Sequence, residues 1–320
     1  MSIEHAVFLD VATVDIGDLD RHSLLATTPG WAFHDYTTPG ETAARIAGAD
    51  VVVSNKTVLD RNDLQRAAGL RLVCVAATGT NNVDLDAARE LGIAVTNVTG
   101  YATPAVVQHV FTPILALSTR LEAYRSAVER GDWQKAAAFC LLDYPVRELA
   151  GLSIGIVGYG ELGRGVADVA RAFGMQVLVG QRPGGGPAPD RVPLDELLRR
   201  ADVVSLHVPL AGNTRDLIGT RELALMKDDA LLINTARGGI VDEQALADAL
   251  RAGRIGGAGV DVLTVEPPRA GNVLLSADIP NLIVTPHIAW ASRESRQRLL
   301  DEVAENIAAF ARGERRNRVD

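Results

Sequence analysis

The stretch GIVGYGELG, residues 155–163, decides the fold class of this chain. It places Gly158, Gly160 and Gly163 in the spacing GxGxxG, directly after an apolar strand-like run and at the start of a helix-like segment. In this arrangement the first glycine allows a tight turn, the second lets backbone approach a pyrophosphate, and the third lets the helix pack closely on the strand. We therefore predict a dinucleotide whose phosphates lie at the N-terminus of that helix. A tight strand-to-helix turn without a ligand is the alternative.

The next strand-like run ends without the usual acidic residue. In VLVGQRPGG, residues 177–185, Gln181 and Arg182 occupy the position, ~20 residues after the glycine motif, where a carboxylate ordinarily binds the ribose 2′-hydroxyl of NAD. A carboxylate would repel a 2′-phosphate, whereas an uncharged Gln beside an Arg supplies a cation suited to phosphate. The pattern favours NADP(H), with NAD(H) possible. If Arg182 is only a solvated loop residue, Gln181 would accept NADH without discrimination.

Short apolar runs alternate with helix-like segments along the whole chain. This alternation is typical of βαβ units and a mostly parallel sheet, and it predicts an α/β protein with two doubly wound sheets. One series covers about the first hundred residues, and a second begins at residue 152. Between them, residues 103–131 read as one long helix that Pro113 should kink. Residues 291–313 form an amphipathic helical pattern.

Composition limits the classes of partner. At 320 residues the chain can bury two cores, and 47% hydrophobic with 22% charged residues is ordinary for a globular protein. The net charge of -8 is spread without a long run of either sign, which argues against a nucleic-acid surface and favours a small-molecule partner.

Cysteine usage and the termini bear on the compartment. Cys74 and Cys140 are far apart and lack CxxC spacing, so we expect unpaired thiols, a reducing compartment and no metal site. Residues 1–11 lack the features of a signal peptide. Residues 91–119 carry no charged side chain, but Gly and Pro interrupt them, so no membrane span is expected. The expected location is the cytoplasm.

Three ionisable residues stand out by their context. Arg237, Glu266 and His287 each follow the end of a predicted strand. Because ligands of doubly wound sheets bind beyond the carboxyl ends of the strands, the three side chains could converge on one ligand. Taken singly, each also has an ordinary explanation as a surface cation, a solvated carboxylate and a structural histidine.

Together with the glycine motif, these segments resemble the D-2-hydroxyacid dehydrogenase family over nearly the whole chain. Within the family the chain is most similar to glycerate dehydrogenases that act as hydroxypyruvate reductases, on the basis of residues 131–151 and 285–300. The segments that carry the family resemblance are VAATGTNNVDLDAARELGIAVTNVTGY (75–101), HVPLAGNTRDLIG (207–219), NTARGGIVDEQAL (234–246), GVDVLTVEPP (259–268) and TPHIAW (285–290).

The resemblance implies an architecture. A Rossmann cofactor domain, residues 103–288, would be inserted into a flavodoxin-like substrate domain made of residues 1–102 and 289–320. It also implies a homodimer and a cleft that closes around ligand by hinge motion.

The resemblance further implies roles for the site residues. His287 would be the general acid in reduction, with Glu266 orienting its ring, and Arg237 would pair with the substrate carboxylate and carbonyl oxygen. The backbone of Thr78, Gly79 and Thr80 would bind the substrate carboxylate, unless this segment is only a turn that ends a strand. Trp290 would cover the substrate side chain.

Cofactor contacts would come from the glycine motif and from residues that follow later strands. Asp261 would accept a hydrogen bond from the nicotinamide carboxamide, and His207 would lie against the cofactor, although a histidine at the end of a core strand can also be structural. Residues 103–110, TPAVVQHV, differ from the Val-Ala-Glu sequence that is common at this place in the family. The contacts of that helix to cofactor and substrate therefore stay undecided. The expected cofactor-binding residues are Gly158, Tyr159, Gly160, Glu161, Leu162, Gly163, Gln181, Arg182, His207, Val208, Pro209, Thr214, Thr235, Ala236, Asp261 and His287.

The expected function is an NAD(P)H-dependent, reversible reduction of hydroxypyruvate, and of glyoxylate, to the D-2-hydroxy acid. One alternative is a dehydrogenase for another small D-2-hydroxy acid. Another is a dinucleotide-sensing, corepressor-like scaffold, in which bound cofactor controls assembly.

Overall fold

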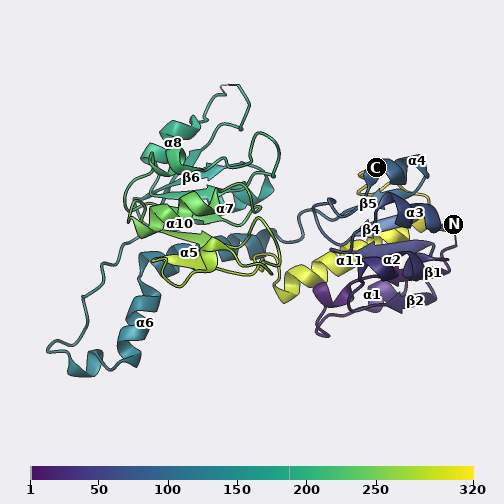
Figure 1. The fold of residues 1–320 in the computed structure, drawn as a ribbon, viewed down its shortest axis with the longest axis horizontal. Coiled ribbons are helices and arrows are strands. Elements are labelled where there is room, and N and C mark those ends of the chain that lie inside the picture. The colour runs from purple at the N-terminus through teal and green to yellow at the C-terminus, as the bar shows by residue number, and fades with distance from the viewer. Residues whose placement is uncertain (1, 187) are drawn as a thin grey trace. The chain divides into compact units, whose positions relative to one another are not determined.

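The computed structural model describes residues 2–186 and 188–320 and divides the chain into two compact units (Figure 1). Unit 1 consists of Met1–Ala102 and Trp290–Asp320, and unit 2 consists of Thr103–Ala289. Each unit has a parallel sheet with hydrophobic clusters of its own. Two parallel-sheet α/β domains are therefore present, as the alternating pattern predicts.

Unit 1 contains a five-stranded sheet in the order β2-β1-β3-β4-β5. Strands β3 and β4 are buried at every position, because helices cover both faces of a parallel sheet. The strands are β1 (His5–Phe8), β2 (Gly30–Phe33), β3 (Val51–Ser54), β4 (Leu72–Val75) and β5 (Ala94–Thr96). The helices are η1 (Val11–Thr13), α1 (His22–Leu25), α2 (Pro39–Ile46), α3 (Arg61–Arg66), α4 (Leu85–Glu90) and α11 (Arg293–Ala311).

The second chain segment of unit 1 completes its core. Helix α11 contributes Leu299, Val303 and Ile307 to the cluster formed by β1, β3 and β4. After it, the amide of Val319 donates to the carbonyl of Val95 in β5, and the amide of Val95 donates to the carboxylate of Asp320. Residues 318–320 are therefore joined to the edge of this sheet.

The order of this sheet reverses between β1 and β3, a position where sheets of this kind often bind ligands. Here Asp10, which follows β1, fills that position. Its buried carboxylate accepts hydrogen bonds from the amides of Asn55 (2.9 Å), Lys56 (2.6 Å) and Thr57 (2.7 Å), in the loop after β3. The protein thus supplies its own anion to these amides.

Unit 2 contains a six-stranded parallel sheet in the order β11-β10-β9-β8-β6-β7, which reverses between β6 and β8. The strands are β6 (Ser153–Val157), β7 (Gln176–Val179), β8 (Val203–Leu206), β9 (Leu231–Asn234), β10 (Gly257–Val260) and β11 (Leu282–Val284). The helices are α5 (Thr103–Ser118), α6 (Leu121–Glu129), η2 (Trp133–Lys135), α7 (Glu161–Ala172), α8 (Leu194–Arg200), α9 (Thr220–Leu223), α10 (Glu243–Arg251) and η3 (Val273–Leu275).

The single helix predicted for residues 103–131 is wrong, because the structure has two helices there. Arg120 adopts a left-handed conformation, with φ of 55°, and separates α5 from α6. Pro113, in contrast, lies inside α5. Its ring packs against Gly259 of β10, where an added Cβ would come within 2.6 Å of the proline. The interruption comes from backbone conformation at Arg120, which the apolar pattern does not encode.

Two kinds of feature are absent from the described residues. In residues 2–186 and 188–320, no helix combines the length and apolarity needed to cross a bilayer. Over the same ranges, no three His, Cys, Asp or Glu side chains are grouped so that they could hold a metal ion.

Candidate active site

A histidine and a glutamate form a hydrogen-bonded pair at the carboxyl edge of the unit 2 sheet. His287 follows β11 and Glu266 follows β10, and the two strands are neighbours. Nδ1 of His287 lies 2.6 Å from Oε2 of Glu266. The second carboxylate oxygen of Glu266 accepts a hydrogen bond from the amide of Leu263 at 2.8 Å. With Nδ1–H donated to the carboxylate, Nε2 is the ring nitrogen that can exchange a proton with a substrate.

The turn that carries His287 is built around Asp261. His287 has a φ of 56°, and its amide donates to the carbonyl of Asp261 at 2.8 Å. The buried carboxylate of Asp261 accepts hydrogen bonds from the Thr285 hydroxyl (2.5 Å) and from the amides of Ile288 and Ala289 (2.9 Å each). These bonds hold the backbone of His287 in a conformation that few non-glycine residues adopt.

Helix α5 contributes a histidine to the same turn. Nε2 of His109 lies 2.9 Å from the Thr285 hydroxyl and 3.4 Å from the Asp261 carboxylate. Because the Thr285 hydroxyl donates to Asp261, His109 is the donor in its bond to that hydroxyl. The sequence reasoning missed His109, and its available signal was a single imidazole on an apolar helix. It provides one contact from the divergent 103–110 segment to the candidate site.

Arg237 lies on the neighbouring loop, after β9. Its Nη1 donates to the carbonyl of Ala236 at 2.7 Å, and its own carbonyl accepts from the Asn234 side chain at 3.1 Å. At Gly238 an added Cβ would lie 2.0 Å from the carbonyl oxygen of Leu263, so this loop packs directly on the loop that carries Glu266. The structure therefore joins Glu266 to His287 and places exposed Arg237 on an adjoining loop.

The glycine motif forms the turn between β6 and α7. Gly158 has a φ of 97°, and an added Cβ there would lie 2.4 Å from the carbonyl oxygen of His207. At Gly163 an added Cβ would lie 2.2 Å from the carbonyl oxygen of Gly158, whereas at Gly160 it would meet nothing within 4 Å. Two glycines thus serve close packing, and Gly160 borders open space.

The N-terminus of α7 is not capped by a side chain, because its N-cap residue is Gly160. Its first amides therefore keep their capacity for an outside acceptor. Glu161 lies in the first turn, and its Oε1 accepts a hydrogen bond from the Thr103 hydroxyl at 2.6 Å. Leu162, the next residue, is half-buried.

Two buried polar atoms, which follow the neighbouring strands β8 and β9, lack hydrogen-bond partners within the described residues. Among the residues that the structure describes, Nδ1 of His207 and Oγ1 of Thr235 are the buried side-chain atoms without a hydrogen bond. Nε2 of His207 is 2.9 Å from the Ser205 hydroxyl, and burial lowers the pKa of His207 to about 4, so the ring is neutral. Unpaired buried polar groups are costly and are often completed by a ligand. The cradle beside Gly160 and these two atoms fit a bound dinucleotide.

The remaining cofactor candidates lie along the ends of β7, β8 and β9. Val208 is buried and is packed against Gly158. The hydroxyl of Thr214 donates to Pro209 O (2.6 Å) and accepts from Ala211 N (2.7 Å). Ala236 is buried between Thr235 and Arg237.

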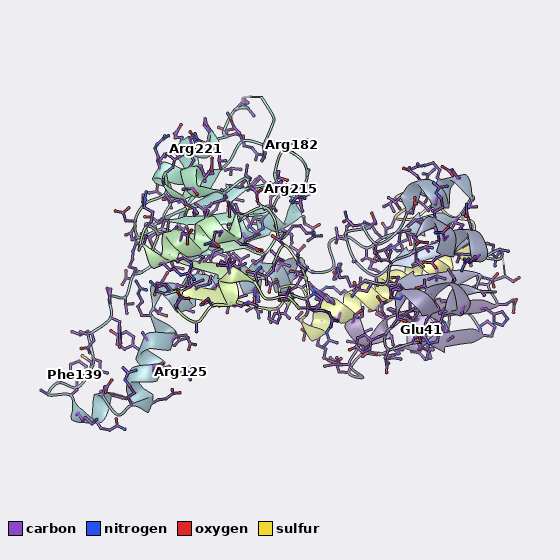
Figure 2. The ribbon with its side chains drawn as sticks, viewed as in Figure 1. Glu41, Arg125, Phe139, Arg182, Arg215 and Arg221 are labelled. Atoms are coloured by element: carbon purple, nitrogen blue, oxygen red, sulfur yellow. The ribbon has the colours of Figure 1, made fainter. Side chains whose placement is uncertain are left out.

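Gln181 and Arg182 follow the end of β7. The amide of Gln181 donates to the carbonyl of Val192 at 2.8 Å, which fixes its backbone. Arg182 is exposed at the start of the glycine-rich loop (Figure 2). Nδ2 of Asn213 donates to the Pro183 carbonyl at 2.9 Å and ties the loop to the segment after β8. Pro187, within this loop, lies outside the described residues.

The predicted substrate-binding residues belong to unit 1. The Thr78 hydroxyl donates to the Val98 carbonyl at 2.9 Å in the loop after β4. Within the described chain, the amides of Thr78, Gly79 and Thr80 donate no hydrogen bond. Trp290, at the start of the second segment of this unit, makes an edge contact with Tyr101 at a ring-centroid distance of 6.3 Å.

Comparison with known proteins gives consistent matches. Residues 111–289 match the family model described as D-isomer specific 2-hydroxyacid dehydrogenase, NAD binding domain. The chain is 46% identical over 309 residues to glycerate dehydrogenase of Methylorubrum extorquens, covering 94% of this chain and 98% of the relative. It is 38% identical over 314 residues to hydroxypyruvate reductase of Blautia hydrogenotrophica, covering 96% and 97%. The crystal structure of the TT0316 protein from Thermus thermophilus superposes with a TM-score of 0.86 at 36% identity, covering 99% and 100%.

Proposed function

Because the chain belongs to the D-isomer specific 2-hydroxyacid dehydrogenase family, whose members are oxidoreductases acting on CH–OH groups, we propose that it reduces hydroxypyruvate to D-glycerate. The observation that carries this proposal is the Glu266–His287 pair, with its 2.6 Å hydrogen bond on the loops beside Arg237. The names of the two curated relatives support hydroxypyruvate as the substrate. Glyoxylate, a smaller 2-oxo acid, is proposed as a second substrate.

The geometry of unit 2 supports the proposed catalytic roles. In reduction, Nε2–H of the His287 imidazolium donates a proton to the carbonyl oxygen, which becomes the hydroxyl of the product. Glu266 holds Nδ1–H, orients the ring and stabilises the imidazolium before the transfer. The guanidinium of Arg237 pairs with the substrate carboxylate and polarises the carbonyl. A nicotinamide, when bound, supplies the hydride that reaches the carbonyl carbon.

The glycine turn and the neighbouring strand ends are proposed to hold the dinucleotide. The amides of Glu161, Leu162 and Gly163 at the start of α7 would bind the pyrophosphate beside Gly158, Tyr159 and Gly160. The proposed residues at the nicotinamide end are His207, Val208, Pro209, Thr214, Thr235, Ala236, Asp261 and His287. The unpaired atoms of His207 and Thr235 support this assignment.

We further propose that NADP(H) is preferred and NAD(H) is accepted. Gln181 replaces the carboxylate that would repel a 2′-phosphate, and Arg182 follows it. The backbone position of Gln181, fixed at the end of β7 by Val192, supports this assignment.

Unit 1 is proposed to be the substrate domain. The amides of Thr78, Gly79 and Thr80, which donate no bond within the described residues, are suited to bind a carboxylate. Trp290 is proposed to restrict the substrate side chain to small polar groups.

Consumption of the reduced cofactor tests the proposed function. Hydroxypyruvate, glyoxylate and pyruvate are compared at matched concentrations, and kcat/KM is measured with NADPH and with NADH. We expect hydroxypyruvate to be fastest and NADPH to be preferred. Equal use of both cofactors would remove the NADPH preference alone, and turnover of another 2-oxo acid alone would reassign the substrate. Absence of turnover with every acid would favour a dinucleotide-sensing scaffold.

We propose that the protein is a homodimer. From α6 to residue 146, the chain extends away from the sheet of unit 2 (Figure 1) and exposes large apolar side chains. Phe139 is 91% exposed and Leu142 is 86% exposed, and apolar side chains exposed together often mark an interaction surface. We propose that a second copy of the chain covers these side chains. Sedimentation of the wild type and of a Phe139→Ser, Leu142→Ser double variant measures the oligomeric state.

We also propose that the protein works in the cytoplasm. Both cysteines, buried Cys74 and half-buried Cys140, are free, which fits a reducing compartment. Cell fractionation measures this location.

A further inference from the structure

A second arginine lies at the end of β7, on the far side of the glycine-rich loop from Arg182. Arg191 directly precedes Val192, and Val192 forms a parallel bridge with Gly180. The amide of Val192 donates to the carbonyl of Val179, and the amide of Gln181 donates to the carbonyl of Val192, at 2.8 Å each. These bonds fix the backbone of Arg191 beside the end of β7. In such folds the 2′-substituent of the adenosine ribose binds at this position.

The side chain of Arg191 is also held in place. Its Cζ lies 5.1 Å from the centroid of the Tyr159 ring, a cation–π contact, and its Nη1 lies 3.3 Å from the carbonyl oxygen of Gly180. Tyr159 lies between Gly158 and Gly160 in the glycine turn. The guanidinium therefore connects the turn after β6 with the end of β7.

Tyr159 itself has two further arginine contacts. Nη2 of Arg171 lies 3.4 Å from its hydroxyl, and Nη1 of Arg164 lies 3.3 Å from its carbonyl oxygen. The ring on which Arg191 stacks is thus anchored from α7.

The positive charge of Arg191 is not neutralised by a partner. In the described part of the chain, no carboxylate oxygen lies within 4.0 Å of its guanidinium, although most other arginines of unit 2 have such a partner. A guanidinium has five N–H donors, and the structure uses one of them on Gly180. The others can bind an anion with the planar geometry that suits phosphate.

Arg182 differs in each of these respects. It is exposed, it begins a loop rich in glycine, and its side chain has no hydrogen bond among the described residues (Figure 2). Ordering such a side chain on a ligand costs conformational entropy, whereas half-buried Arg191 is already ordered. We propose that Arg191, stacked on Tyr159, is the main residue that binds the 2′-phosphate of NADP(H), with Arg182 in a secondary role. This inference rests on the proposed NADPH preference.

Calorimetric binding of 2′,5′-ADP and 5′-ADP to the intact protein isolates this contact without turnover. The ratio of the two affinities is measured for the wild type, Arg191→Gln, Arg191→Lys, Arg182→Gln and Arg199→Gln. Arg199 is an exposed arginine on α8, outside the proposed site, and provides a matched loss of charge. Binding of 5′-ADP reports that each variant has folded.

We expect Arg191→Gln to lower the preference for 2′,5′-ADP by about 10- to 100-fold, the range for hydrogen bonds to a charged group. Arg191→Lys should give an intermediate loss, because it keeps the charge without the planar stack. Arg182→Gln should lower the preference only about threefold, the size of an exposed ion pair. Arg199→Gln should leave it unchanged.

Three results would overturn the inference. If Arg191→Gln keeps the wild-type ratio while Arg182→Gln loses it, Arg182 binds the phosphate and the proposed NADPH preference stands. If Arg191→Gln weakens both ligands equally, Arg191 supports the turn and does not read the phosphate. If the wild type binds the two ligands equally, the NADPH preference fails and this inference fails with it.

Discussion

Both sheets of this protein have backbone amides near the point where the strand order reverses, and the two units use them differently. In unit 1 the order reverses between β1 and β3, and the amides of Asn55, Lys56 and Thr57 in the loop after β3 all donate to the carboxylate of Asp10. In unit 2 the order reverses between β6 and β8, and the N-terminus of α7 is left without a side-chain cap. The first position is a closed edge, because a carboxylate of the protein already binds its amides. The second is an open edge, because no side chain caps the amides of α7.

This difference separates a structural anion position from the proposed binding position within one chain. A parallel sheet brings the amides of its loops together wherever its strand order reverses. Whether a side chain already satisfies those amides decides if a ligand is needed there. In unit 1 a buried carboxylate binds the amides of a loop of the same unit. At the carboxyl edge of the unit 2 sheet lie glycines, the Glu266–His287 pair and two polar atoms without a partner in the described residues.

The largest expected effect is a loss of activity at the open edge without a loss of stability. Arg237→Lys should lower kcat/KM by roughly 1000-fold, because Lys cannot provide the planar donor fork, while the exposed position leaves the free energy of unfolding unchanged. Arg221→Lys, on exposed α9 and paired with Asp195, is the matched control (Figure 2). Steady-state kinetics and urea denaturation measure both quantities. Near-normal turnover of Arg237→Lys would remove this residue from the mechanism.

At the closed edge we expect the opposite outcome, a loss of stability. Asp10→Ala leaves three amides without their acceptor and should lower the free energy of unfolding by about 3 kcal/mol. Asp86→Ala removes a carboxylate from an exposed i,i+3 pair with Arg89 and should change it by less than about 0.5 kcal/mol. Urea denaturation compares the two variants. Equal effects would mean that the Asp10 carboxylate is not needed to close the loop.

The smallest expected effect concerns pH and His207, the buried histidine of the open edge. Burial lowers the pKa of His207 to about 4 from an ordinary value of 6.5, so between these values the unfolded chain takes up a proton that the folded ring does not. Acid therefore destabilises the wild type, by about 2 kcal/mol near pH 5 relative to neutral pH. In His207→Gln this part of the pH dependence should disappear, as urea denaturation at the two pH values would show. An unchanged pH dependence would contradict the burial of this ring.

Local patterns made much of the fold predictable and pointed to the residues of the candidate site. The glycine motif and the alternation of apolar runs predict the α/β class, and Arg237, Glu266 and His287 are visible because each follows a strand. The hydrogen bond between Glu266 and His287 is consistent with that reasoning, since β10 and β11 are neighbours in the sheet.

Other features depend on contacts between distant parts of the chain. Asp10 reads as the end of an apolar strand, and only the packing of β1 beside β3 brings it to the amides of residues 55–57. His109 and Arg191 look like a helix residue and a loop residue until Thr285 and Tyr159 are placed beside them. The break at Arg120 depends on one backbone conformation, which the apolar periodicity of that segment does not show.

The contribution of the second chain segment to the core of unit 1 has a consequence for synthesis of the protein. Unit 2 is a continuous stretch, Thr103–Ala289, and it can begin to fold as soon as it leaves the ribosome. Unit 1 has its first strands translated early, yet its core needs Leu299, Val303 and Ile307 of α11. At about 5–20 residues per second, the nascent N-terminal strands wait roughly 10 to 40 seconds for these side chains. During that interval the apolar faces of these strands are exposed, which is the condition in which nascent chains bind chaperones.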